Sequence, residues 1–116
     1  MTTLYGIPNC DTVKKARTWL TDHNVDYSFH DFKKQGVPEA QLDHWLAAVG
    51  WDTLVNRKGT TWRGLDAATK AAVLDAASAR SAILGAPSIV KRPVVVWANG
   101  QVTVGFKPEA FAEQLA

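Results

Sequence analysis

The sequence contains only one cysteine, Cys10, among its 116 residues. A single cysteine cannot form a disulfide within the chain, and such sparse use is typical of proteins kept in a reducing compartment. The first residues, Met1–Pro8, contain neither a basic segment nor a long apolar run, so we expect no secretory signal peptide. Together these features predict a cytoplasmic protein.

Long hydrophobic runs, a strong charge of one sign and metal-ligand motifs are also missing. The apolar run Val94–Ala98 is far shorter than the roughly 20 residues that a membrane helix needs. The formal net charge of +2 is too small to predict nucleic-acid binding. The histidines His23, His30 and His44 show no metal-ligand spacing, and no glycine-rich phosphate loop is present, so we expect neither a metal nor a bound cofactor.

What the chain does contain is an ordinary globular composition, with 47% hydrophobic and 21% charged residues. Its length suits one domain, and no linker, repeat or low-complexity tract divides it. We therefore predict a single domain over residues 1–116.

The N-terminal part of the chain follows a strand–helix–strand pattern. Apolar spacing predicts a strand over Thr2–Ile7, a helix from Cys10 to His23 and a second strand over Asp26–Phe32. Asn9 or Asp11 is the expected N-cap of that helix. Such a unit implies two parallel strands joined by a right-handed crossover.

The middle of the chain, about 38–85, has helical patterns and no strand signal, which predicts a helical insertion. Its expected elements are, in order, a helix over Pro38–Val49 stopped by Gly50, a polar loop over Asn56–Gly64, an alanine-rich helix over Leu65–Ala79 and a short helix over Ser81–Leu84. The buried stripe of the alanine-rich helix is expected to consist of Leu65, Thr69, Ala72, Val73 and Ala76.

Strand signals return near the C-terminus. Val94–Trp97 and Gln101–Gly105 flank Asn99-Gly100, the strongest short hairpin signal, and Pro108 suits the first position of a last helix. The complete order is therefore βαβ, a helical insertion and ββα, which predicts an α/β protein with a mixed four-stranded sheet.

Cys10 lies between the first strand and the helix that follows it. A thiolate at a helix start faces free backbone N–H groups and the positive end of the helix dipole, which stabilise its charge and favour a nucleophilic role. A small, inert buried cysteine is the alternative interpretation. Val13 stands where a Cys-x-x-Cys motif has its second thiol, so an intermediate on Cys10 needs an external thiol, such as glutathione or a glutaredoxin-like protein, to resolve it.

Positive charges cluster in the later loops, among them Arg57, Lys58, Arg92 and Lys107. Two of these residues lie on constrained backbone, because Arg92 precedes Pro93 and Lys107 precedes Pro108. A cation on a rigid turn suits the binding of an oxyanion or a carboxylate near the cysteine. Solvated surface charge is the alternative interpretation for each residue taken singly.

Four segments resemble, in order, those of the arsenate reductase (ArsC) and Spx family, and most closely its YffB-like subgroup. They are Tyr5–Ala16 (YGIPNCDTVKKA), Gly59–Arg63 (GTTWR), Ile89–Val96 (IVKRPVVV) and Gly105–Glu109 (GFKPE). The resemblance covers essentially the whole chain. It implies a thioredoxin-like fold with a helical insertion and a cis peptide bond between Arg92 and Pro93, beside the cysteine loop.

The same resemblance implies roles for individual residues. In arsenate reductases the cysteine attacks arsenate, three arginines hold the oxyanion and glutathione resolves the adduct. Cys10 matches the nucleophile and Arg92 matches one arginine, whereas Lys107 replaces another and so loses the planar bidentate fork.

The position of the third arginine falls on Asn56, with Arg57 and Lys58 beside it as the candidate cations. Asn9, next to the cysteine, is a further candidate for substrate binding. Which of the residues at 56–58 serves the site stays open.

The resemblance predicts a glutathione-dependent thiol reductase, with glutathione as co-substrate and a small oxidised or oxyanionic substrate. The altered cations favour a substrate other than arsenate, such as a glutathione mixed disulfide. The alternative is an Spx-like regulator that contacts RNA polymerase without catalysis. Spx-type redox switching uses a second cysteine, and this chain has Val13 there, which disfavours that alternative.

Overall fold

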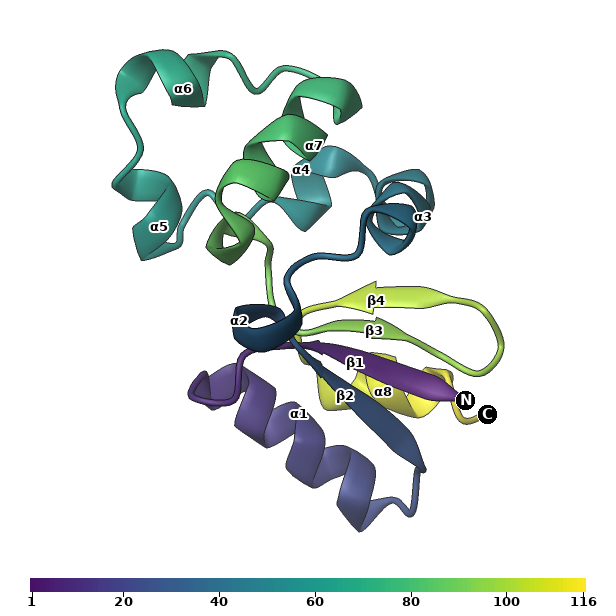
Figure 1. Ribbon diagram of the computed structural model, residues 1–116. Helices are drawn as coiled ribbons and strands as arrows, with labels where there is room; N and C mark the ends of the chain where they lie inside the picture. Colours follow the sequence, from purple (N-terminus) through teal and green to yellow (C-terminus); the bar gives the residue numbers. More distant parts are fainter. The chain divides into compact units, whose positions relative to one another are not determined.

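The computed structural model describes every residue from Met1 to Ala116. The chain forms two compact units (Figure 1). The first consists of Met1–Gly36 together with Arg92–Ala116, and the second of Val37–Lys91. The predicted helical insertion falls within the second unit. None of the helices has the length and apolar character needed to cross a membrane.

The first unit is a sheet with helices. Its elements are β1 (Thr2–Gly6), α1 (Asp11–Asp22), β2 (Tyr27–Asp31), the single-turn α2 (Phe32–Gln35), β3 (Val94–Val96), β4 (Val102–Val104) and α8 (Pro108–Glu113). The sheet has the order β2-β1-β3-β4, in which β1 and β2 are parallel and the other pairs are antiparallel. This confirms the predicted βαβ…ββα order and the mixed four-stranded sheet.

One face of this sheet is covered by α1 and α8 (Figure 1). The side chains buried there are Leu4, Val13, Ala16, Leu20, Val95, Trp97 and Phe111. Phe111 is fully buried, and its ring meets those of Trp19, Trp97 and Phe106 edge-on, at centroid distances of 5.4, 4.9 and 4.9 Å. Phe111 therefore anchors the short α8 in the core of the first unit.

The hairpin between β3 and β4 forms at the predicted turn. Gly100 has φ +87°, a conformation that glycine adopts without a steric penalty, and its N–H donates to the carbonyl of Trp97 at 2.8 Å. The amide N–H of Gln101 donates to Oδ1 of Asn99 at 2.9 Å, which tightens the turn further. The ladder is shorter than predicted, because each strand contributes only three paired residues.

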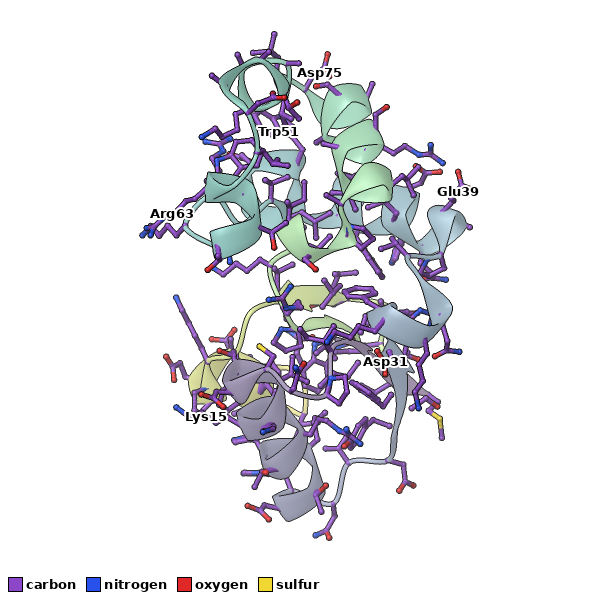
Figure 2. The ribbon with its side chains drawn as sticks, turned by 60° about the vertical axis from the view of Figure 1, so that its left-hand side comes forward. Lys15, Asp31, Glu39, Trp51, Arg63 and Asp75 are labelled. Carbon is purple, nitrogen blue, oxygen red and sulfur yellow. The ribbon has the colours of Figure 1, made fainter.

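The second unit is mostly helical. Its elements are α3 (Glu39–Val49), α4 (Trp51–Leu54), α5 (Thr60–Arg63), α6 (Ala67–Ala71), α7 (Ala76–Gly85) and a 3-10 turn, η1 (Pro87–Ile89). Its buried side chains include Leu42, Trp45, Leu54, Ala79 and Ile83 from α3, α4 and α7. On the surface, Arg80 of α7 pairs with Asp43 at 2.7 Å and with Glu39, which lies on α3 (Figure 2), at 3.1 Å.

Two predictions for this unit were wrong. The loop predicted over Asn56–Gly64 contains the single-turn helix α5, and the helix predicted over Leu65–Ala79 is broken into α6 and the start of α7. The break is at Asp75 (Figure 2), whose carboxylate accepts from the amide of Ser78 at 2.9 Å while Oγ of Ser78 accepts from the amide of Asp75 at 3.0 Å. This reciprocal capping box starts a new helix, and of the predicted stripe only Val73 is buried.

The middle block contains no strand, as predicted. An isolated antiparallel bridge nevertheless joins Val55 to Val90, just beyond the block. The N–H of Asn56 donates to the carbonyl of Ile89 at 2.7 Å, and the N–H of Lys91 donates to that of Leu54 at 2.8 Å. The segment after α4 is thus tied to the segment that leads back to the sheet.

Candidate active site at the carboxyl end of the first strand

Four strand ends meet at one edge of the sheet. Gly6, the last residue of β1, pairs with Asp31 at the end of β2, and Tyr5 pairs with Val94 at the start of β3. The N–H of Gly105, just after β4, donates to the carbonyl of Pro93 at 2.9 Å. The loops that leave this edge therefore include the cysteine loop after β1, the approach to β3 and the exit from β4.

Cys10 is the N-cap residue of α1. Its backbone is extended, with φ −99° and ψ 126°, and its carbonyl accepts from the N–H of Lys14 at 2.9 Å. The predicted caps were wrong: Asn9 lies exposed in the preceding turn, and Asp11 is the first residue of the helix. Because Cys10 uses only its backbone for capping, its side chain makes no cap hydrogen bond and stays at the positive end of a 12-residue helix.

The cysteine side chain is half-buried and packs against the hydrophobic core of the first unit. Three residues later, Val13 is fully buried in that core. It lies so close to Gly6 that a Cβ added to the glycine would be 2.8 Å from Cγ2 of Val13. The position that carries a second thiol in a Cys-x-x-Cys motif is here a packing position between α1 and β1.

Arg92 and Pro93 are joined by a cis peptide bond, as the family resemblance implied. Pro93 is buried and Arg92 is half-buried, with its Nε shielded from solvent. The Arg92 side chain is therefore held at the sheet edge rather than extended into water.

Lys107 is the exposed N-cap of α8, and its carbonyl accepts from the N–H of Phe111 at 3.0 Å. Its backbone is set by Gly105, which has φ +82°, and by Pro108 at the first helical position. The structure thus brings Cys10 and the two predicted cations, Arg92 and Lys107, to loops at the same edge of one sheet.

The other two predicted cations belong to the second unit. Arg57 and Lys58 are exposed, and the guanidinium of Arg57 lies 5.0 Å from the centre of the Trp51 ring. Asn56 has a structural role, because its Oδ1 accepts from the N–H of Lys58 at 3.3 Å and its carbonyl accepts from Gly59. The loop thus presents the exposed cations Arg57 and Lys58 beside a half-buried Asn56.

Both cations border a surface hollow of about 340 Å³, together with Lys91 and Asp52. No sequence pattern singles out Asp52. Lys91 could be linked to the site from the sequence only as the neighbour of Arg92.

Comparison with known proteins supports the family resemblance over nearly the whole chain. The ArsC family model matches residues 5–114. A solved structure named YffB is 52% identical, with a TM-score of 0.93 and 100% of both chains covered. An arsenate reductase (ArsC) related protein from Brucella melitensis is 51% identical, with a TM-score of 0.73, over 97% of this chain and 92% of that one. An uncharacterised protein of Haemophilus influenzae is 40% identical over 100% of both chains.

A more distant relative has a regulatory name. The global transcriptional regulator Spx of Streptococcus pneumoniae is 23% identical over 94% of this chain and 81% of its own length. The strand order, the helical insertion and the cysteine loop together match a thioredoxin-like fold shared with these relatives. The chain belongs to the ArsC family.

Proposed function

We propose that this protein is a glutathione-dependent thiol reductase in which Cys10 is the nucleophile. The observation that carries the proposal is the position of Cys10 at the N-cap of α1, with a side chain that makes no capping hydrogen bond. The helix dipole and the unpaired N–H groups of the first turn stabilise a thiolate there. The half-buried position leaves the sulfur open to attack a small substrate.

The proposed substrate is a mixed disulfide between glutathione and another thiol. The Cys10 thiolate attacks the glutathionyl sulfur, a new disulfide forms at Cys10, and the other thiol leaves as a thiolate that takes a proton from water. A glutathione thiolate then attacks the glutathionyl sulfur of this adduct. Glutathione disulfide is released and the Cys10 thiolate is restored, so the two electrons that reduce the substrate come from glutathione.

Arg92 and Lys107 are proposed to hold the anionic part of the substrate at the sheet edge. Glutathione carries a carboxylate at its glycine end, and charge-assisted hydrogen bonds to a guanidinium or an ammonium are the stronger class of hydrogen bond. Arg92 offers a planar fork for this carboxylate, and Lys107 adds a point charge on a flexible stem. A pair of one arginine and one lysine suits a carboxylate better than it suits arsenate, which the arsenate reductases hold with three arginines.

The second half-reaction is assigned to an external thiol because the chain has no other cysteine. Val13 also fills the core at the position where an internal resolving thiol would stand. The adduct on Cys10 is therefore a stable intermediate whenever free glutathione is absent, and it can be detected by intact mass.

The experiment is to mix the full chain with glutathione disulfide at pH 7 and follow the intact mass. We expect one glutathionyl group per chain, released by added glutathione, and none in Cys10→Ser. Arg92→Gln should slow adduct formation by about tenfold, the loss of one charge-assisted hydrogen bond, and Arg92→Lys should restore part of the rate. Lys70→Gln, which removes a charge in the second unit, is the matched control.

The proposal fails if Cys10 reacts no faster than an unstructured cysteine peptide and Arg92→Gln leaves the rate unchanged. That pair of results would make Cys10 an ordinary half-buried thiol and the cation irrelevant.

A regulatory role is the second candidate, favoured by the Spx relative. In that case the protein would contact RNA polymerase, and Cys10→Ser would leave binding intact. Pull-down of purified RNA polymerase by the tagged full chain at moderate salt tests this role. A negative result, with the Spx relative as positive control, would exclude it.

A further inference from the structure

The hollow of the second unit combines charges of both signs. Its volume of about 340 Å³ lies at the lower end of the range, about 300–1,000 Å³, in which small-molecule pockets are found. The lining includes Asp52, Asn56, Arg57, Lys58 and Lys91. Three cations and one carboxylate therefore line a single surface depression.

The backbone beneath these charges is fixed. The bridge between Val55 and Val90 and the hydrogen bond from the N–H of Lys91 to the carbonyl of Leu54 join the two segments that carry the cations. Lys91 therefore has a defined position relative to the 56–58 turn, although the two are far apart in sequence. Lys91 also directly precedes Arg92 in the chain.

The carboxylate and the guanidinium are also positioned. Oδ1 of Asp52 accepts from the N–H of Thr53 at 3.1 Å, and it lies 3.2 Å from the place where a Cβ on Gly50 would stand. Arg57 is held over the Trp51 ring. Asp52 and Arg57 form no ion pair with each other.

A hollow with separated charges of opposite sign suits a zwitterion better than an inorganic oxyanion. Phosphate or arsenate would be attracted by the cations and repelled by Asp52. An α-amino acid group presents an ammonium and a carboxylate on one carbon, and each finds its opposite charge here. Glutathione carries this group at its γ-glutamyl end.

We propose that the hollow binds the α-amino acid end of glutathione, with Asp52 accepting hydrogen bonds from the ammonium and with Arg57 and Lys91 meeting the carboxylate. The proposal rests on the proposed function for its choice of ligand. It assigns to the second unit a recognition role that is separate from the chemistry of Cys10.

The test is an NMR titration of the full chain with S-methylglutathione, which keeps both ends of glutathione but cannot form a disulfide. We expect saturable shifts in the amides of residues 52–58 and 91. Asp52→Asn and Lys91→Gln should each weaken binding by about fivefold, as expected for exposed charge pairs. Asp22→Asn, an equal change of charge at the end of α1, should leave the affinity unchanged.

Two analogues test recognition of the α-amino acid group itself. Deamino S-methylglutathione lacks only the ammonium and should bind the wild type about fivefold more weakly, with no further loss in Asp52→Asn. Free glutamate carries the same α-amino acid group and should shift the same amides. Equal binding of the deamino analogue, no shift with glutamate, or shifts that avoid residues 52–58 and 91 would each overturn the proposal.

A parallel reaction distinguishes failure of the hollow assignment from failure of the proposed reductase function. Hydroxyethyl disulfide has no amino acid end, so its reaction with wild-type Cys10 reports the thiol chemistry alone. If Cys10 reacts with it while S-methylglutathione leaves the hollow unshifted, the hollow assignment is wrong and the reductase stands. If the hollow shifts while Cys10 is inert toward both disulfides, the recognition site stands and the reductase is wrong.

Discussion

Replacing Gly6 by alanine tests how closely the cysteine-bearing helix packs on the sheet. Gly6 is buried at the end of β1, where it pairs with Asp31 of β2. An added Cβ would lie 2.8 Å from Cγ2 of Val13, well inside the usual carbon–carbon contact distance of about 3.5–4.0 Å. Val13 is fully buried, and a valine in a helix has one strongly preferred rotamer, so neither side can move aside easily.

The structure supports an estimate of the cost. Forcing an extra methyl into a packed core costs about 1–3 kcal/mol, while replacing glycine by alanine stabilises by about 0.4–1 kcal/mol through the unfolded chain. We therefore expect Gly6→Ala to lower the free energy of unfolding by about 1–2 kcal/mol. Val13→Ala alone removes two buried methyls and should cost about 2 kcal/mol. In the double variant the new methyl occupies the space left by Cγ2, so the loss should be smaller than the sum by at least about 1 kcal/mol.

The assay is urea unfolding followed by far-UV circular dichroism, with midpoints and m values compared across the four proteins. Gly85→Ala is the matched control, because no atom lies within 4 Å of its added Cβ, and it should leave stability unchanged or raised. Additive losses within about 0.5 kcal/mol, or a Gly6→Ala protein as stable as Gly85→Ala, would refute the close packing.

Three further outcomes are expected. Phe111→Ala should lower the free energy of unfolding by about 3–5 kcal/mol in the same urea assay, whereas Phe111→Leu should lose less. Hydrogen bonds from Thr69 and Ser78 lower the pKa values of Asp66 and Asp75 below the usual 3.8. The stability that these carboxylates contribute is therefore present above pH 3.8 and lost as the pH falls through their lower pKa values in the folded protein. The double variant Asp66→Asn/Asp75→Asn should accordingly show a smaller drop in melting temperature from pH 5 to pH 2. Burial raises the pKa of Tyr5 above 10.0, so its contribution is present below pH 10 and lost as the pH rises further, and Tyr5→Phe should reduce the alkaline loss of melting temperature.

The sequence predicted the first unit better than the second, for identifiable reasons. In the first unit, alternation and helical spacing agreed with strong local signals such as Asn99-Gly100 and Pro108. In the second, alanine-rich composition suggested one long helix, but alanine does not mark where a helix ends. The Asp75–Ser78 capping box does mark where α7 begins. A search of the sequence for a capping residue three positions before its partner would have located the break.

The candidate site was only partly predictable. The helix-start cysteine followed from local order, yet Cys10 itself is the N-cap, because helix boundaries shift easily by a residue or two. The cis peptide at Pro93 came from family resemblance and not from residue chemistry. Asp52 was missed altogether, because the segments that bring it and Lys91 to one hollow are joined by the bridge between Val55 and Val90, a long-range pairing that no local pattern encodes.

The order of strands in the sheet has a consequence for how the chain is made. The central strand β1 leaves the ribosome well before its partner β3, because the paired residues Thr3 and Val96 are about ninety residues apart in the sequence. Everything from Val37 to Lys91 is synthesised before the first unit can complete its sheet. Such distant pairing is typical of slow folding, and until then one edge of β1 has no strand beside it. The cysteine loop is thus synthesised early, but the sheet edge around it is completed late. A nascent or truncated chain therefore carries the thiol before it has Arg92 and Lys107, the cations that are proposed to direct its chemistry.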